Sequence, residues 1–413
     1  MIDPTSGRTI RAGILNARVL IVLLVLLLTT GPSLSLPAPA AAMSLRQDTA
    51  EEQAPPLLAE RWAVPEGLPE LPDVSAEAVF VGDIETGQVL FARDADAQRA
   101  PASTAKVAVA VTLVDILTDL DQVVTIQDSD TVDITVFSNA QLAVDDEVTV
   151  EGLLYGLMLP SGNDAARALA RVAGQTLDPE SDDPTATFLD AVNARVAELG
   201  ATNTVILNPA GEDTEGQHSS ARDLAILTAA LLDNETLATI VDTEVYGMVV
   251  GGPSARTVNL SNTNPLLAEA GIIGVKTGST EAAGACLITG AVFSGSSRVV
   301  IVVLGSELVY NDAGQVAQDE RTQDTLDVIR AIPESYQWID LTAPGVVEGL
   351  TEELAAWQVT LGSGSEIVIP AGDTADLTYR LVLGPSGEPQ EVVGSVLFFL
   401  GDEQIAEQPV YQL

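Results

Sequence analysis

The sequence has very few of the residues that most often carry enzyme chemistry. It contains one cysteine, Cys286, and one histidine, His218. No disulfide can therefore form within the chain, and a zinc site built from histidine and cysteine would lack ligands. A Ser-His-Asp triad would have to use His218. Basic residues are also scarce: 18 Lys+Arg stand against 59 Asp+Glu, a net charge of −41. Such an acidic surface repels phosphate backbones, so we expect no nucleic-acid partner.

Lysine is the scarcer of the two long basic residues. Only Lys106 and Lys276 occur, and the other basic residues are arginines. Arginine stays protonated in proteins, whereas a lysine can lose its proton and act as a base. A chain that prefers arginine is expected to keep lysine where arginine cannot replace it, although the count alone is better explained by a chance bias in composition.

The N-terminal segment resembles an export signal. Three arginines precede an unbroken apolar run at 19–28, and small residues with an Ala-x-Ala pattern follow at 38–42. This order predicts a secretory signal peptide over residues 1–42, and hence a location outside the cytoplasm. The run is too short to span about 30 Å of hydrocarbon. The alternative is an uncleaved N-terminal anchor that extends through Leu34 and Leu36.

The whole chain, with 413 residues and 46% apolar composition, is long enough for two or three domains. Residues 43–73 are rich in proline and predict an extended linker. Strands are expected at 78–81, 89–91, 271–277, 285–292 and 298–305, and helices at 101–120, 150–173, 185–199, 219–232 and 322–331. Strands from both ends thus bracket a helical middle, which predicts a mixed α/β domain over 74–336. Alternating apolar residues predict a small all-β domain over 341–413.

The first candidate for chemistry is Ser103-Thr104-Ala105-Lys106, near the start of the predicted helix at 101–120. Residues three apart on a helix share one face. A serine hydroxyl is a weak nucleophile until a neighbour removes its proton. Lys106 can do so only if burial or a nearby cation lowers its pKa. Taken alone, the motif is better explained by a helix-capping serine and a surface lysine.

The second candidate is Ser161-Gly162-Asn163. Its functional interpretation places the Ser161 hydroxyl in a proton relay to a leaving amine. The Asn163 amide would then steady the Lys106 ammonium and the substrate backbone. Taken alone, Pro-Ser-Gly-Asn is ordinary turn and helix-cap chemistry.

The third candidate is Lys276-Thr277-Gly278, at the end of an apolar strand. Lys276 would supply positive charge for a substrate carboxylate, and Thr277 a hydroxyl to bind it. The missing side chain of Gly278 would leave room for a peptide along this edge. The Lys276 charge would also lower the pKa of Lys106. Taken alone, the motif could equally be a lysine and a glycine at the end of a hairpin, with no binding role.

The three segments gain their meaning as a set. Ser-x-x-Lys, Ser-x-Asn and Lys-Thr-Gly follow one another in the order found in penicillin-binding proteins and class A β-lactamases. Both lysines of the chain fall inside them. The chain resembles the D-alanyl-D-alanine carboxypeptidases, low-molecular-mass penicillin-binding proteins that are serine peptidases. The similarity covers roughly 74–336 and a C-terminal part like the family's all-β domain, with further matching stretches at 99–104, 153–166, 216–223 and 262–264.

The resemblance implies a fold and a site. The fold would be a penicillin-binding-protein and β-lactamase-like α/β domain, an antiparallel sheet flanked by helices with a helical subdomain, followed by the all-β domain. Ser103 would be the acylated nucleophile and Lys106 its base. Ser161 and Asn163 would assist proton transfer and positioning. Lys276 and Thr277, in the motif that ends with Gly278, would bind the substrate carboxylate. The backbone N–H groups of Ser103 and Ser279 would form the oxyanion hole.

The implied substrate is the D-Ala-D-Ala end of peptidoglycan stem peptides, with β-lactams as covalent inhibitors and no cofactor or metal. The enzyme would work in the cell wall or at the outer face of the cytoplasmic membrane, with any membrane tether at the N-terminus. His218 is expected to be a loop residue before a helix capped by Ser219 or Ser220, and Cys286 a small apolar strand residue.

Two rival interpretations and one departure from the family pattern stay open. Ala210-Gly211-Glu212-Asp213 stands where relatives usually have His-Gly-Leu-Asp, which leaves the shape of that loop undetermined. A β-lactamase on the same scaffold would need a glutamate to activate the deacylating water, and no Glu-x-x-x-Asn element is evident between Asn163 and Lys276. A wall-binding protein without catalysis is the other alternative.

Overall fold

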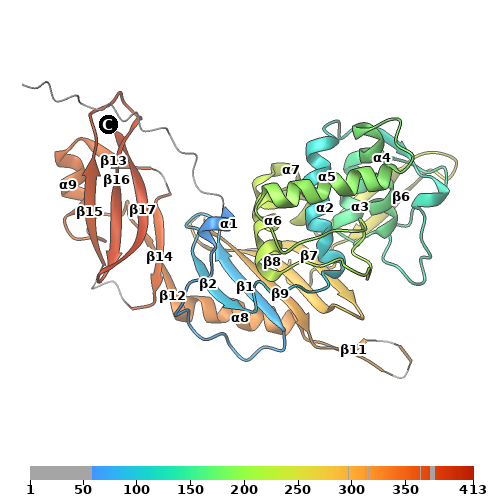
Figure 1. The fold of residues 1–413 in the computed structure, drawn as a ribbon, viewed down its shortest axis with the longest axis horizontal. Helices are drawn as coiled ribbons and strands as arrows, with labels where there is room; N and C mark the ends of the chain where they lie inside the picture. Colours follow the sequence, from blue (N-terminus) through green and yellow to red (C-terminus); the bar gives the residue numbers. More distant parts are fainter. Residues whose placement is uncertain (1–57, 296, 312, 315, 363, 373–376) are drawn as a thin grey trace, which may run out of the picture. The chain divides into compact units, whose positions relative to one another are not determined.

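The computed structural model describes residues 58–413 apart from 296, 312, 315, 363 and 373–376 (Figure 1). The predicted signal peptide or anchor at 1–42 lies outside the described residues, as does the first part of the predicted linker. Within the described part, no single helix is long and apolar enough to cross a membrane. Only α6 (Ala221–Asp233) and α7 (Glu235–Val241) taken together, at a 108° bend, meet that length and composition.

A five-stranded antiparallel sheet forms the scaffold of the mixed α/β region, with strand order β2-β1-β9-β8-β7. Its strands are β1 (Ala78–Asp83), β2 (Val89–Arg93), β7 (Ile272–Thr280), β8 (Gly284–Ser294) and β9 (Ser297–Ser306). β1 pairs with β9 from Ala78 opposite Leu304 to Asp83 opposite Val299. Strands from both ends of the region therefore share one sheet, as the sequence predicts.

Helices cover both faces of this sheet, which is why all six residues of β1 are buried. Val79 and Val81 pack with residues of α8 (Arg321–Ser335), whereas Ala78 and Phe80 point to the opposite face and join the larger core under α2 (Lys106–Ile116) and α6. The two-residue period of a strand thus divides one hydrophobic segment between two cores.

The helical part is organised around α2. Its residues from Lys106 to Leu113 are all buried, as expected for a helix that is apolar on every side. The surrounding elements are η1 (Ala102–Ala105), α3 (Val150–Met158), α4 (Asn163–Leu177), α5 (Pro184–Glu198), α6 and α7, with the short strands β3 (Val123–Thr125), β4 (Glu147–Thr149), β5 (Val245–Val250) and β6 (Arg256–Ser261), and η2 (Asp128–Asp130).

The helix predicted at 150–173 is in fact two helices, α3 and α4, and this corrects the sequence-based assignment. Pro160 lies in the break, and the following Ser161 has a φ of +62°, a left-handed conformation that no helix continues. Because of this break, the second candidate segment lies in the turn between α3 and α4, where it contacts the site described below.

Part of the predicted linker belongs to the core, which is a second correction. After the single turn α1 (Leu58–Arg61), Trp62 is fully buried and its ring lies 5.3 Å from that of Phe80. The Trp62 indole N–H donates to the backbone oxygen of Asp83 at 3.3 Å. An isolated tryptophan among prolines has no periodicity, so the sequence pattern did not reveal this packing.

The C-terminal region is mainly β, as predicted, with one short helix, α9 (Leu350–Ala356). A four-stranded sheet has the order β13-β17-β16-β15, and β12 pairs with β14. Its core includes Val396, Phe398 and Val410. The bounds are β12 (Tyr336–Asp340), β13 (Val359–Leu361), β14 (Glu366–Pro370), β15 (Leu377–Leu383), β16 (Val392–Leu400) and β17 (Glu403–Gln412), while the hairpin of β10 (Leu308–Tyr310) and β11 (Val316–Asp319) precedes α8.

Candidate active site

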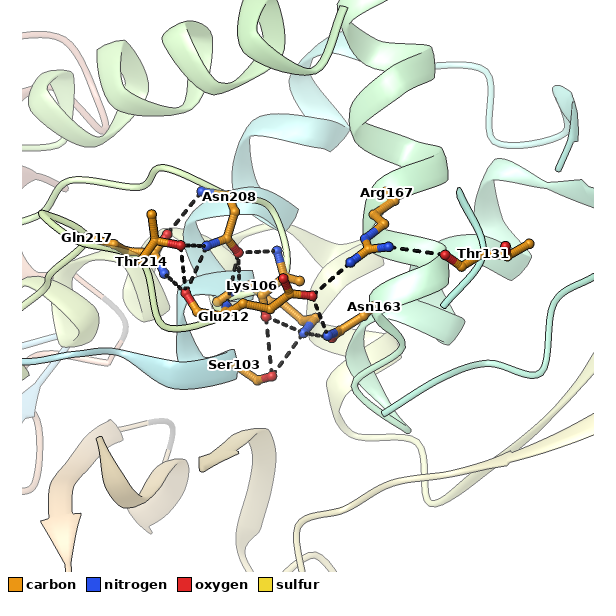
Figure 2. A network of polar contacts seen from close by, with 11 residues as sticks. Ser103, Lys106, Thr131, Asn163, Arg167, Asn208, Glu212, Thr214 and Gln217 are labelled. Carbon is orange, nitrogen blue, oxygen red and sulfur yellow. Dashed lines mark hydrogen bonds and ion pairs between the residues drawn. The ribbon is translucent and has the colours of Figure 1, made fainter. Parts of the chain in front are cut away.

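Ser103 and Lys106 lie together at the start of the central helix. Ser103 is in the 3₁₀ turn η1, and Lys106 is the first residue of α2. The Lys106 Nζ atom lies 2.9 Å from the Ser103 Oγ atom, and also 2.9 Å from Asn163 Oδ1 and 2.6 Å from the backbone oxygen of Ala210 (Figure 2). The geometry predicted from the Ser-x-x-Lys spacing is therefore present.

Burial changes the acid–base behaviour of Lys106. The side chain has no exposed surface, and burial lowers its pKa from 10.5 to about 7, against opposing effects of the Glu212 and Asp164 carboxylates. We expected the Lys276 charge to contribute to this shift, but burial is its cause. Burial also lowers the pKa of Lys276 well below its usual value, and the Lys106 and Arg321 charges lower it further. A lysine with a pKa near 7 can accept a proton at neutral pH.

The second segment reaches the site from the turn between α3 and α4. Asn163 is the first residue of α4, and its amide accepts a hydrogen bond from Lys106 through Oδ1. The Ser161 hydroxyl is buried and has no hydrogen-bond partner among the described residues. An unpaired buried hydroxyl on a left-handed residue is costly, and such costs are concentrated at functional sites.

The third segment packs directly on the turn that carries Ser103. A Cβ atom on Gly278 of β7 would lie 2.9 Å from the Ser103 backbone nitrogen and 3.0 Å from that of Thr104. Only glycine allows the strand to come this close. We expected Gly278 to leave room for a substrate peptide, but the space is used by the turn that carries Ser103.

Lys276 and Thr277 make local contacts in this structure. The buried Lys276 Nζ donates to the backbone oxygen of Thr277 at 2.9 Å. The Thr277 hydroxyl lies 2.6 Å from that of Thr263. Arg321 of α8 donates to the backbone oxygen of Gly278 at 2.8 Å and so fixes the strand from the other side of the sheet.

A cleft of about 290 Å³ opens beside Ser103. Ser103, Asn163 and Ser279 line it, together with the apolar residues Val136 and Phe137 and with residues 210–213 of the loop that departs from the family pattern. Glu212 of this loop was not among the residues predicted to form the site. It accepts hydrogen bonds from Asn163 Nδ2 and from Arg167, and no spacing rule in the sequence places it there.

His218 and Cys286, the single histidine and the single cysteine, lie outside the three segments, and their contacts are those of structural residues. His218 is a loop residue whose Nδ1 lies 2.8 Å from the backbone oxygen of Gly216, and Ser220 caps α6 by accepting from the Asp223 backbone N–H. Cys286 is buried in β8, and burial raises the pKa of its thiol to about 11. Both agree with the sequence-based interpretation.

The site combines a serine beside a buried lysine, a Ser-x-Asn turn and a Lys-Thr-Gly strand, and an antiparallel sheet and a helical subdomain carry it. This combination defines the penicillin-binding-protein class of serine enzymes. The model of one family within this class, D-alanyl-D-alanine carboxypeptidase, matches residues 66–307. The chain belongs to this family of serine-type carboxypeptidases, which act on peptidoglycan with D-Ala-D-Ala ends and whose members are extracytoplasmic penicillin-binding proteins.

Individual relatives agree with this assignment. The chain is 37% identical over 242 residues to the D-alanyl-D-alanine carboxypeptidase of Streptomyces sp. strain K15, and the match covers 57% of this chain and 82% of that protein. It is 26% identical over 368 residues to DacA of Escherichia coli K12, covering 84% and 85% of the two chains.

Solved structures show the same fold. The crystal structure of the Streptomyces K15 DD-transpeptidase superimposes with a TM-score of 0.56 at 33% identity, over 63% of this chain and 98% of that one. Penicillin-binding protein 6B of Escherichia coli, at 24% identity, superimposes with a TM-score of 0.62 over 83% of this chain and 97% of that one, so the likeness extends to the C-terminal β domain.

Proposed function

We propose that this carboxypeptidase removes the terminal D-Ala of peptidoglycan stem peptides through an acyl-enzyme on Ser103. The observation that carries the proposal is the 2.9 Å contact between Ser103 Oγ and the Nζ atom of a fully buried Lys106. A neutral amine at that position takes the hydroxyl proton as the oxygen attacks the peptide carbonyl.

The other predicted residues have defined parts in this reaction. The backbone N–H groups of Ser103 and Ser279, which border the same cleft, stabilise the developing oxyanion. The Ser161 hydroxyl, free of other hydrogen bonds among the described residues, passes a proton to the departing D-Ala nitrogen. Asn163 holds the Lys106 amine in place. Water then hydrolyses the ester.

The substrate carboxylate is bound at the third segment. The Thr277 hydroxyl, which lies 2.6 Å from that of Thr263, would accept or donate a hydrogen bond there. Lys276 now donates to a backbone oxygen, and an arriving carboxylate would favour its ammonium form. β-Lactams present a carboxylate and a strained amide to the same groups, so they act as covalent inhibitors.

The remaining parts of the proposal concern location and organisation. Residues 1–42 export the chain, either as a cleaved signal peptide or as an N-terminal tether to the membrane. Residues 74–336 are the catalytic domain and 341–413 a separate β domain. No metal or cofactor takes part in the proposed steps, and nucleic acid is not a partner.

The direct test is release of free D-Ala from a peptide that ends in D-Ala-D-Ala. We expect release by the wild type, no release by Ser103→Ala, and unchanged release by Ser254→Ala, a matched control at an exposed position. Release that persists in Ser103→Ala, with melting temperatures equal, contradicts the proposal.

A further inference from the structure

The loop that departs from the family pattern has a well-defined conformation. The Asn208 side-chain oxygen accepts from the backbone N–H groups of Ala210, Gly211 and Glu212, at 3.1, 2.8 and 3.0 Å. The side chains of Asn208 and Gln217 both donate to the Glu212 backbone oxygen at 2.8 Å (Figure 2). These five hydrogen bonds fix the backbone of Glu212 at the edge of the cleft.

The Glu212 carboxylate is held by one of its two oxygens only. Oε1 accepts both from Asn163 Nδ2, at 3.2 Å, and from Arg167 of α4, at 3.0 Å. Arg167 is itself fixed by a 3.1 Å hydrogen bond to the backbone oxygen of Thr131. Within the described residues, Oε2 has no hydrogen-bond partner. The side chain is 33% exposed and lines the same cleft as Ser103.

Hydrolysis of an acyl-enzyme needs a base, because water is a poor nucleophile for an ester. The Lys106 Nζ atom is already held by Ser103 Oγ, Asn163 Oδ1 and the Ala210 oxygen, so a carboxylate with an unpaired oxygen is the better candidate for activating the water. Glu212 lines the same cleft as Ser103, and its Oε2 atom has no hydrogen-bond partner among the described residues. Class A β-lactamases use a glutamate for the equivalent step, although from a different sequence pattern.

We propose that Glu212 is the general base that activates water for hydrolysis of the Ser103 acyl-enzyme. The inference rests on the proposed acylation of Ser103 and adds the residue that ends the cycle. As a consequence, this enzyme hydrolyses its peptide acyl-enzyme and, more slowly, its penicillin adduct, which leaves with the ring opened.

The step balances as follows. The water oxygen bonds to the acyl carbon while one of its protons passes to Glu212 Oε2. The bond between that carbon and Ser103 Oγ then breaks, and the serine oxygen takes a proton from the Lys106 ammonium. Lys106, which takes up a solvent proton in the acyl-enzyme, is left as the neutral amine that the next acylation needs. The product acid and Glu212 each lose a proton to solvent, so one proton is released in net for each ester hydrolysed.

The test compares the full-length wild type with Glu212→Gln, and a penicillin is the probe. Glutamine keeps an oxygen that can accept hydrogen bonds from Asn163 and Arg167, and only the unpaired oxygen is replaced, by an amide NH2 group that cannot act as a base. Intact-protein mass gives the rate at which the adduct forms and the rate at which it disappears. We expect adduct formation within about threefold of the wild type and adduct loss slowed roughly 10²- to 10⁴-fold. Glu215→Gln, an exposed change of the same charge on the same loop, should alter neither rate.

The outcomes separate the two proposals. If the wild type forms no adduct, the proposed acylation of Ser103 fails whatever Glu212 does. If the adduct forms but disappears equally fast in Glu212→Gln, the role of Glu212 is wrong. If formation and loss slow by the same factor, Glu212 merely positions Asn163, and the proposal is again wrong. Should Glu212→Gln not fold, Glu212→Asp is the second variant, because it retains the base at a greater distance. Adduct loss must then slow by a larger factor than adduct formation. If both slow by the same factor, or neither slows, the proposal is wrong.

Discussion

The ionisation of Lys106 gives the most quantitative prediction. Its pKa of about 7, compared with 10.5 for an exposed lysine, means that the site shifts the equilibrium toward the neutral amine by about 5 kcal/mol relative to an exposed lysine. Only this neutral form can take the proton of Ser103. About half of the enzyme molecules have it at pH 7, and about one in a hundred at pH 5. The rate of acylation by penicillin should therefore rise about tenfold per pH unit in acid and level off above about pH 7.

The assay is the rate of adduct formation between pH 5 and 9 at constant ionic strength, measured by intact-protein mass. Lys106→Arg is the informative variant, because arginine keeps a cation next to Ser103 but cannot lose its proton. We expect acylation to fall roughly 10²- to 10⁴-fold in this variant at every pH. A wild-type rate that does not change between pH 5 and 8, or a Lys106→Arg variant that acylates normally, would refute the role of the neutral amine.

Three further substitutions test the surroundings of the site. Gly278→Ala places a methyl group against the Ser103 backbone nitrogen, so acylation should slow about 10²-fold; an unchanged rate would mean that the strand can move away. Ser161→Ala should reduce D-Ala release roughly 10²- to 10⁴-fold at an unchanged melting temperature, because its hydroxyl has no partner to lose among the described residues; equal activity would exclude the proton relay. Trp62→Ala removes a fully buried ring from Phe80 and should lower the free energy of unfolding by about 3–5 kcal/mol in urea titrations, whereas a loss below about 1 kcal/mol would show that the segment is not part of the core.

The sequence predicted the parts of the fold and site that depend on local spacing. Ser103 and Lys106 meet because they are three residues apart at a helix start, and β1 pairs with β9 because buried strands occur at both ends of the region. The helix break at Ser161 was missed, since apolar residues on either side keep a helical pattern through it.

Contacts between distant segments were not readable from one sequence. The loop that carries Glu212 is fixed by Asn208 and Gln217, and Glu212 meets Asn163 only after the chain has folded. The cause of the Lys106 pKa shift has the same origin: a nearby cation could be guessed from the motifs, but the complete burial of the amine is a property of the packed core.

The central claim is that Ser103 carries the acyl group, and the most direct measurement is the site of covalent labelling. The protein is treated with penicillin, digested, and its modified peptide sequenced by mass spectrometry. A single penicilloyl group on Ser103 that is absent from Lys106→Arg under the same conditions is the expected result. A label on Ser161 or any other residue, or no label on a folded wild type, would contradict it.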